Sequence, residues 1–147
     1  AAIVPMDNAT GPMDLNGVVV ASPSRPVTVL GVPATWPSHA TLSQDHDLLL
    51  PIVRAYPAAT TILAGDFNST PWSFARQRDD RDLGLIRRTR AVFTWPIAAW
   101  RHRLIPVLPI DHVYAGRSWA TVSVRRGPTL GSDHYPVVVT LAPIGPR

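Results

Sequence analysis

The sequence predicts an α+β fold, and three observations support that prediction. β-branched residues dominate two short runs, at 17–21 and 27–32, which is typical of strands. Between residues 41 and 56 the apolar side chains recur instead at helical spacing. A third apolar run, at 60–64, is too short for a helix and ends at a glycine, which indicates a buried strand. Strands and helices are therefore both expected.

Length and composition point to one folded domain. A chain of 147 residues can bury a real core, and a hydrophobic content of 46% with 16% charged residues argues against disorder. No apolar stretch approaches the roughly eighteen residues of a membrane span, so no membrane contact is expected within this chain. The absence of cysteine excludes disulfides, thiolate metal ligands and a cysteine nucleophile.

The charged residues are of only two kinds. All 14 basic side chains are arginine and all 10 acidic ones are aspartate, so the chain has no lysine and no glutamate. Coding bias explains an arginine-rich chain without lysine, which makes the calculated pI of 10.6 a weak indication of nucleic-acid binding. The chain also begins without methionine, and we expect it to be processed or cut from a longer protein.

In the first half of the chain the elements follow in a simple order. Residues 1–16 mix proline, glycine and asparagine and are expected to form an irregular lead-in. The runs at 17–21 and 27–32 then predict a hairpin. A helix is predicted over 41–56, with Pro51 kinking it or marking a restart.

In the second half, the strand at 60–64 is followed by a predicted short helix that reaches about residue 78. Thr70 is expected to be its N-cap because proline at the next position suits the first helical turn. A long, mostly irregular excursion is expected over 79–109, and long loops in compact domains are often functional. Three strands complete the prediction, at 110–114, 120–124 and 136–141.

Polar residues with metal-binding and acid–base chemistry stand at the ends of these apolar strands. If the segment after Gly65 is extended, Asp66 and Asn68 share one face and Phe67 takes the other. A hard oxygen ligand and a hydrogen-bonding amide then lie together at a strand end. Two later segments repeat the device of an aspartate followed by a histidine, at 111–112 and 133–134.

These three motifs, in this order, resemble those of the endonuclease/exonuclease/phosphatase superfamily: Gly65-Asp66-Phe67-Asn68, Ile110-Asp111-His112 and Gly131-Ser132-Asp133-His134-Tyr135-Pro136. Members are metal-dependent phosphoesterases that include DNase I-like nucleases, sphingomyelinases and inositol phosphatases. The resemblance covers roughly residues 17–142 and implies that 17–147 form the C-terminal half of the domain. The fold implied is half of a four-layer α/β-sandwich, with a mainly antiparallel sheet and helices on one face.

The resemblance also implies roles for individual residues. Asp66 would orient or deprotonate the attacking water, and Asn68 would hold a phosphate oxygen. His134 would contact the phosphate, with Asp111 accepting its other ring proton. Asp66 and Asp133 would help to bind Mg²⁺ or Mn²⁺, which would be held weakly because the family's metal-binding glutamate has no counterpart in this chain. Pro33 stands where many members carry a catalytic histidine.

Each site residue also has a purely structural interpretation. An aspartate after glycine can cap a turn, and His134 can be an ordinary residue at a strand entry. His112 is expected beside the site, His39 and His46 in solvent, and the tryptophans at 72, 95 and 100 as core or loop anchors. Eight arginines against three aspartates give residues 76–103 a net charge of +5, which either steers a phosphorylated substrate or forms a self-paired surface.

The function predicted from the sequence is a metal-dependent phosphoesterase, of phosphodiesterase or nuclease-like type, completed by the missing N-terminal half or by a second copy of the chain. The alternative is a non-catalytic truncated relative that binds a phosphate ligand or a protein. DNA, phospholipid and inositol phosphate remain open as substrates.

The segments 68–73 and 94–96 further resemble a bacterial branch whose catalytic domain often follows membrane helices, which suggests an extracytoplasmic domain of a membrane-anchored protein. We expect Asp66, Asn68, Asp111, Asp133 and His134 to converge at one sheet edge.

Overall fold

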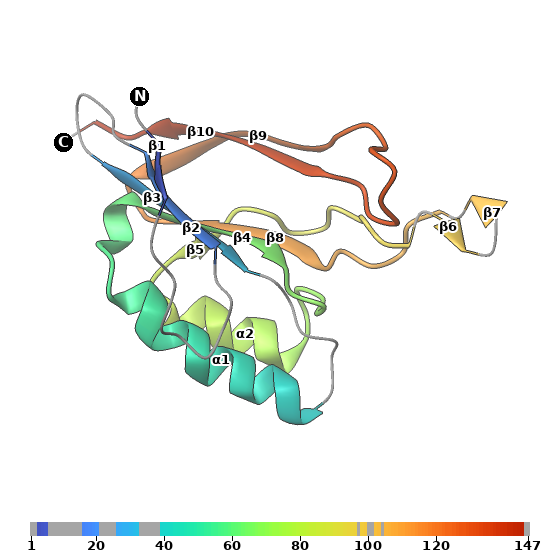
Figure 1. The fold of residues 1–147 in the computed structure, drawn as a ribbon, viewed down its shortest axis with the longest axis horizontal. Helices are drawn as coiled ribbons and strands as arrows, with labels where there is room; N and C mark the ends of the chain where they lie inside the picture. The colour runs from blue at the N-terminus through green and yellow to red at the C-terminus, as the bar shows by residue number, and fades with distance from the viewer. Residues whose placement is uncertain are drawn as a thin grey trace.

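The computed structural model of the chain describes residues 3–5, 16–20, 26–32, 39–96, 98–99, 102–103 and 105–145. A six-stranded mixed sheet lies at the centre of this part of the chain. Two helices cover one face of the sheet, and a long β-hairpin lies over the other (Figure 1). Helices on one face were predicted, and the structure confirms them.

Strand order in the central sheet brings the second half of the chain beside the first. The order is β1 (Ile3–Pro5), β2 (Asn16–Val20), β3 (Val27–Val32), β4 (Thr61–Asp66), β8 (Asp111–Ala115) and β5 (Ile86–Arg87). Neighbouring strands are antiparallel except β3 and β4, which are parallel and need the crossover that helix α1 (His39–Arg54) provides. The pairing of β2 with β3 confirms the predicted hairpin.

The main core lies between the sheet and the helices. Along β3 the side chains alternate between buried and half-exposed, so Leu30 faces the helices together with Leu63 of β4 and Tyr114 of β8. Leu49 and Val53 of α1 complete this cluster. The helical spacing seen in the sequence is thus the spacing of the residues that α1 buries. Pro51 lies inside the helix.

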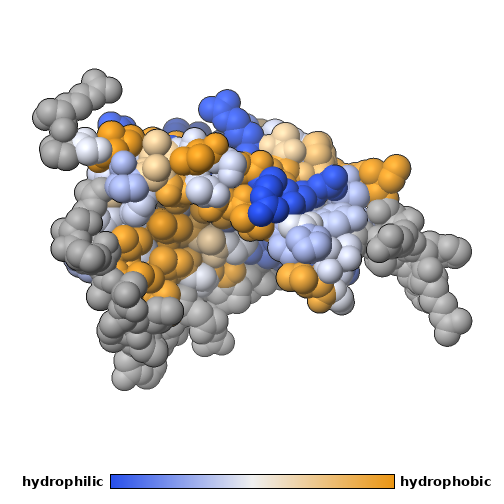
Figure 2. Space-filling model, turned by 90° about the horizontal axis from the view of Figure 1, so that it is seen from above, coloured by the Kyte–Doolittle hydropathy of each residue, from blue (hydrophilic) through white to orange (hydrophobic). Residues whose placement is uncertain are grey.

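The other face of the sheet carries a thinner layer. Strands β9 (Trp119–Arg126) and β10 (Val137–Pro143) form an antiparallel hairpin of their own, as does the small ladder of β6 (Ala98–Ala99) and β7 (His102–Arg103). Most β9 side chains are exposed, including Val122 at 64%. Viewed from above, the molecule shows apolar side chains gathered at the surface between hydrophilic ones (Figure 2).

Several local predictions need correction. The expected irregular lead-in contains a strand, β1, which pairs with β2, while residues 6–15 lie outside the described part. Helix α2 (Phe74–Asp82) is capped by Ser73, whose hydroxyl accepts from the Arg76 N–H, and not by Thr70. The stretch 79–109 is less irregular than expected, because α2 continues into it and β5, β6 and β7 lie within it.

His46 was expected in solvent, and that expectation is wrong. The His46 side chain is 1% exposed, between α1 and α2, where its Nδ1 contacts Asp79 and its Nε2 lies 3.4 Å from Asp82 Oδ2. Arg76 reaches the same buried Asp79 at 2.5 Å. The His39 side chain lies outside the described residues.

No helix within the described ranges is long and apolar enough to cross a membrane.

Candidate functional site

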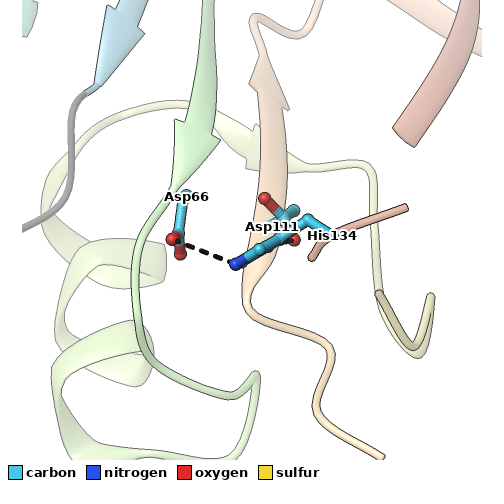
Figure 3. A group of neighbouring side chains, drawn as sticks. All are labelled: Asp66, Asp111 and His134. Atoms are coloured by element: carbon cyan, nitrogen blue, oxygen red, sulfur yellow. Dashed lines mark hydrogen bonds and ion pairs between the residues drawn. The ribbon is translucent and has the colours of Figure 1, made fainter. Parts of the chain in front are cut away.

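Three predicted site residues meet where the neighbouring strands β4 and β8 end and begin, at one end of the central sheet. Asp66 is the last residue of β4 and Asp111 the first of β8, and the two are direct partners in the antiparallel register. His134 reaches the same point from the loop before β10 (Figure 3). One ligand atom from each of the three lies within 4.8 Å of the others. The expected convergence is therefore confirmed for these three residues.

Hydrogen bonding orients the His134 ring. Its Nδ1 lies 2.9 Å from Asp111 Oδ2, so the Nδ1–H donates to that carboxylate, as predicted from the sequence. The opposite nitrogen, Nε2, then faces Asp66 and lies 3.9 Å from its Oδ2. All three side chains are partly exposed, which leaves the group accessible from solvent.

A tight turn holds the Asp66 carboxylate. Asp66 Oδ1 accepts the backbone N–H of Asn68 at 2.8 Å, an Asx-type turn that Asn68 completes with a left-handed φ of 46°. Asp66 and Asn68 were expected on one face only if the chain stayed extended. The chain turns after Asp66, so that condition is not met. Burial is the main cause that raises the pKa of Asp66, and the nearby Asp111 carboxylate raises it further.

Gly65 allows β4 to approach β3 closely. A Cβ atom at this position would lie 2.2 Å from the backbone oxygen of Val32, its register partner on β3. Only glycine fits this contact without moving one of the two strands. Close packing of β4 against β3 thus explains why residue 65 is glycine, whatever role Asp66 has in catalysis or metal binding.

His112 lies beside the site and not in it, as expected. Its neighbour Asp111 points to one face of the sheet, while the His112 side chain is 1% exposed on the other. The Nε2–H donates to the Ser69 carbonyl at 2.8 Å, and Nδ1 lies 3.3 Å from the Thr89 hydroxyl. Burial lowers the pKa of His112 to about 4, so the ring is neutral at pH 7.

Asp133 lies apart from the three-residue group. Its exposed carboxylate accepts a hydrogen bond from the Trp95 indole N–H at 3.0 Å, and this bond is the main cause that lowers the pKa of Asp133. The Trp95 and His134 rings are 6.2 Å apart. Trp95 thus contacts two predicted site residues: it hydrogen-bonds Asp133, and its ring lies near the ring of His134.

A cavity of about 300 Å³ opens at this group. Asp66, Asp111 and His134 form its polar side, and Val113 and Val137 are among the apolar residues of its wall. A polar cluster at the mouth of a partly apolar cavity is the usual form of a small-molecule or catalytic site.

Comparison with known proteins agrees with these motifs. The model of the endonuclease/exonuclease/phosphatase family matches residues 4–134. The chain belongs to the endonuclease/exonuclease/phosphatase family. A search of curated protein sequences found no significant match.

Solved structures agree with this assignment at the level of the fold. An endonuclease/exonuclease/phosphatase from Beutenbergia cavernae is 24% identical, with a TM-score of 0.69 over 89% of this chain and 39% of that one. The endonuclease domain of TRAS1, a telomere-specific non-LTR retrotransposon, is 14% identical, with a TM-score of 0.73 over 95% and 68%. Sphingomyelinase C from Streptomyces griseocarneus is 21% identical, with a TM-score of 0.60 over 86% and 57%.

This member of the endonuclease/exonuclease/phosphatase family covers between 39% and 68% of these three structures, so it spans only part of their length. Its mixed sheet with two helices matches DNase I-like structures over part of their length, as expected for part of the four-layer fold.

Sequence reasoning missed Trp95 and Trp72. Trp95 was predicted to be a core or loop anchor, and its hydrogen bond to Asp133 agrees with a loop anchor; the sequence did not indicate that its partner would be a candidate site residue. Trp72 is 59% exposed and therefore no core residue, and Trp100 lies outside the described residues. The signal that could have identified Trp72 was its position four residues after Asn68, the last residue of the Gly65–Asn68 motif.

The basic segment 76–103 is largely self-paired where the structure describes it. Arginine–aspartate pairs connect it internally and to α1: Arg76 with Asp79, Arg78 with Asp47 and Asp82, and Arg87 with Asp80. Arg88 donates instead to the backbone oxygen of Gly116 at 2.7 Å. These contacts favour the self-paired interpretation for three of the arginines, whereas Arg88 is bound by the backbone.

Proposed function

We propose that this chain carries the catalytic Asp–Asp–His group of a divalent-metal-dependent phosphoester hydrolase. The observation behind this proposal is the convergence of Asp66, Asp111 and His134 from three separate strands or loops within 4.8 Å. Hydrolysis of a phosphoester needs an activated water, neutralisation of developing negative charge and help for the leaving oxygen. Two carboxylates and one imidazole are suited to these tasks.

The donor set fits Mg²⁺ or Mn²⁺. Asp66 and Asp111 are register partners that repel each other, and this repulsion is one reason why the Asp66 pKa is raised. A divalent cation between hard carboxylate oxygens would relieve that repulsion. When bound, it would supply Lewis-acid neutralisation of the charge on the phosphoryl oxygens.

The side chains of this chain then divide the remaining work. Asp66 orients the attacking water and accepts its proton. His134 contacts the phosphate through Nε2, because its Nδ1–H is held by Asp111. Asn68, two residues after Asp66, binds a phosphate oxygen. Asp133, whose carboxylate accepts a hydrogen bond from Trp95, would help to hold the cation or its waters.

Two features indicate that the rest of the domain is needed for activity. The chain contains no glutamate to complete the metal site, and it spans about half of its structural relatives. We therefore propose that a further segment, or a second copy of the chain, supplies a ligand and packs on the hairpin side of the sheet. Mg²⁺ binding by the chain alone is then weak.

Titration calorimetry and a substrate panel test the proposal. The panel comprises DNA, sphingomyelin and an inositol phosphate, each with Mg²⁺, with the protein supplied with and without the missing half. Asp66→Ala and His134→Ala are each expected to lower hydrolysis by about 10²-fold or more. Asp47→Asn, at an exposed carboxylate outside the site, is the matched control and keeps activity. Hydrolysis that survives Asp66→Ala would exclude this mechanism.

The missing glutamate and Pro33 favour a second candidate function. In it, the chain binds a phosphate ligand or a protein without turnover. Complementation separates the two candidates, since a chain that stays inactive with the missing half present, while still binding phosphate, is a binding module.

A further inference from the structure

A second cavity lies between the loop that follows Asp66, helix α2 and the segment that contains β5. Its volume is about 620 Å³, roughly twice that of the cavity at the site. The loop after β4, helix α2 and the segment that contains β5 each contribute a wall. A cavity of this size is large enough for a ligand as big as a nucleotide.

The walls of this cavity offer a stacking surface. Trp72 lines it and is 59% exposed, although a tryptophan usually buries most of its ring in a monomer. Leu85 and Ile86 line it too and make the interior largely apolar. An exposed indole over an apolar cavity suits a planar ring, and base–aromatic stacking tolerates any nucleobase.

The two arginines of the cavity differ in their partners. Arg87 is already engaged, with Asp80 at 2.6 Å and the Pro71 carbonyl at 3.4 Å, and it fixes the loop to α2. Arg90 is exposed, and no hydrogen bond or ion pair is found for it within the described part of the chain. The cavity is therefore lined by one uncompensated cation as well as by the indole.

His112 connects both walls of the cavity to the catalytic group. Its Nε2 binds the carbonyl of Ser69, three residues before Trp72, and its Nδ1 contacts Thr89, the residue before Arg90. Three residues span at most about 10 Å. Because His112 directly follows Asp111, the cavity and the site are separated by only a few residues along each connection.

We propose that this cavity is a nucleotide subsite, in which a nucleobase stacks on Trp72 and a phosphate of the same strand pairs with Arg90. The inference rests on the proposed function and favours nucleic acid, bound as a single strand, over the phospholipid and inositol phosphate among its candidate substrates. A nucleotide bound in this cavity would hold the strand against the loop that follows Asp66.

Fluorescence anisotropy of a labelled short oligothymidylate tests the subsite in EDTA, where metal-dependent hydrolysis cannot occur. Trp72→Ala is expected to weaken binding about tenfold or more, and Trp72→Phe to keep it. Arg90→Ala is expected to reduce the slope of log K against log salt by about 0.7, the value for one phosphate contact on a single strand. Phe74→Ala and Arg81→Ala, which alter exposed residues outside the cavity, are the matched controls.

An abasic strand of equal length removes the base and keeps the phosphates. It is expected to bind the unchanged protein as weakly as oligothymidylate binds Trp72→Ala, and this comparison remains valid even if that variant fails to fold. Equal binding of the two strands, or no binding of either, overturns the subsite. An unchanged salt slope in Arg90→Ala overturns the phosphate contact. Oligonucleotide binding that persists, while Mg²⁺ supports no hydrolysis of any substrate of the panel even with the missing half present, refutes the proposed function and leaves the subsite standing.

Discussion

Acidification should destabilise this fold through one buried histidine, His112. An unperturbed histidine has a pKa of 6.5, whereas burial lowers that of His112 to about 4. Between these two values the unfolded chain binds a proton that the folded chain does not, so the free energy of unfolding falls as the pH falls. At about 1.4 kcal/mol for each pKa unit, the full effect is about 3 kcal/mol, and most of it is lost by pH 4.5.

The physical reason for this shift lies in the partners of the ring. The Nε2–H already donates to the Ser69 carbonyl, and Nδ1 faces the hydroxyl of Thr89, which accepts the Val113 N–H at 3.1 Å. The Thr89 hydroxyl is thus free to donate to Nδ1 of a neutral ring. A second ring proton would displace this donor and add a charge that is almost fully shielded from water.

Urea unfolding between pH 7 and pH 4.5, without added metal, measures the effect. Aspartates titrate in every variant, so the quantity to compare is the loss of stability in the unchanged chain minus the loss in His112→Gln. That difference should be about 2–3 kcal/mol. Equal pH dependence in both proteins, or an NMR titration of the His112 ring with a midpoint near 6.5, would refute the reasoning.

Four further substitutions test how the fold supports the site. Gly65→Ala should cost about 2 kcal/mol and perturb the His134 ring signals, because the new Cβ meets the β3 backbone. Gly116→Ala, which meets a backbone oxygen of the turn before β4, should cost as much in thermal unfolding without moving those signals. Asp79→Ala removes the carboxylate that the buried Arg76 guanidinium and the buried His46 ring share, and should cost about 3–5 kcal/mol in urea unfolding, against under about 1 kcal/mol for Asp47→Ala at an exposed pair. Ser73→Ala removes the cap of α2 and should cost about 1 kcal/mol in the same assay; no loss would contradict the assigned cap.

The meeting of Asp66 with Asp111 was predictable because it depends on strand ends. Each aspartate follows or begins an apolar run, and antiparallel pairing of two such runs brings the end of one beside the start of the other. The place of His134 does not follow from this rule, because β10 pairs with β9 in a separate sheet; the sequence indicated only that His134 lies before an apolar strand. Short apolar runs bounded by glycine and proline are local signals, so they survive without knowledge of the tertiary structure.

The environment of His46 was not predictable in the same way. Its position in α1, three residues before the buried Leu49, places it on the helix face that packs inward. A polar residue there is tolerated only with a partner, and that partner, Asp79, lies 33 residues further along the chain. Neither hydrophobic spacing nor charge counting identifies a pairing between two helices.

The N-cap of α2 was mispredicted because two local rules compete. Proline after Thr70 favours a helix that starts at 71, yet the backbone first closes a turn in which the Ser73 N–H donates to the Thr70 carbonyl. The helix begins only afterwards, with Ser73 as its cap. Trp72, which lines the second cavity and is 59% exposed, lies in this turn.

The three-residue group is held by contacts within the described part of the chain, so two effects of the proposed completing segment can be distinguished. Asp66 and Asp111 are fixed by strand pairing, and the His134 loop is fixed by the bond from Tyr135 N–H to the Thr94 carbonyl. The chain contains no glutamate and leaves apolar residues such as Val122 exposed on its hairpin. A segment that supplies a metal-binding glutamate and also covers the exposed apolar residues should raise Mg²⁺ affinity and thermal stability together. A partner that binds only the folded state stabilises that state. A segment that raises stability in EDTA without changing Mg²⁺ affinity would cover the apolar face but supply no ligand.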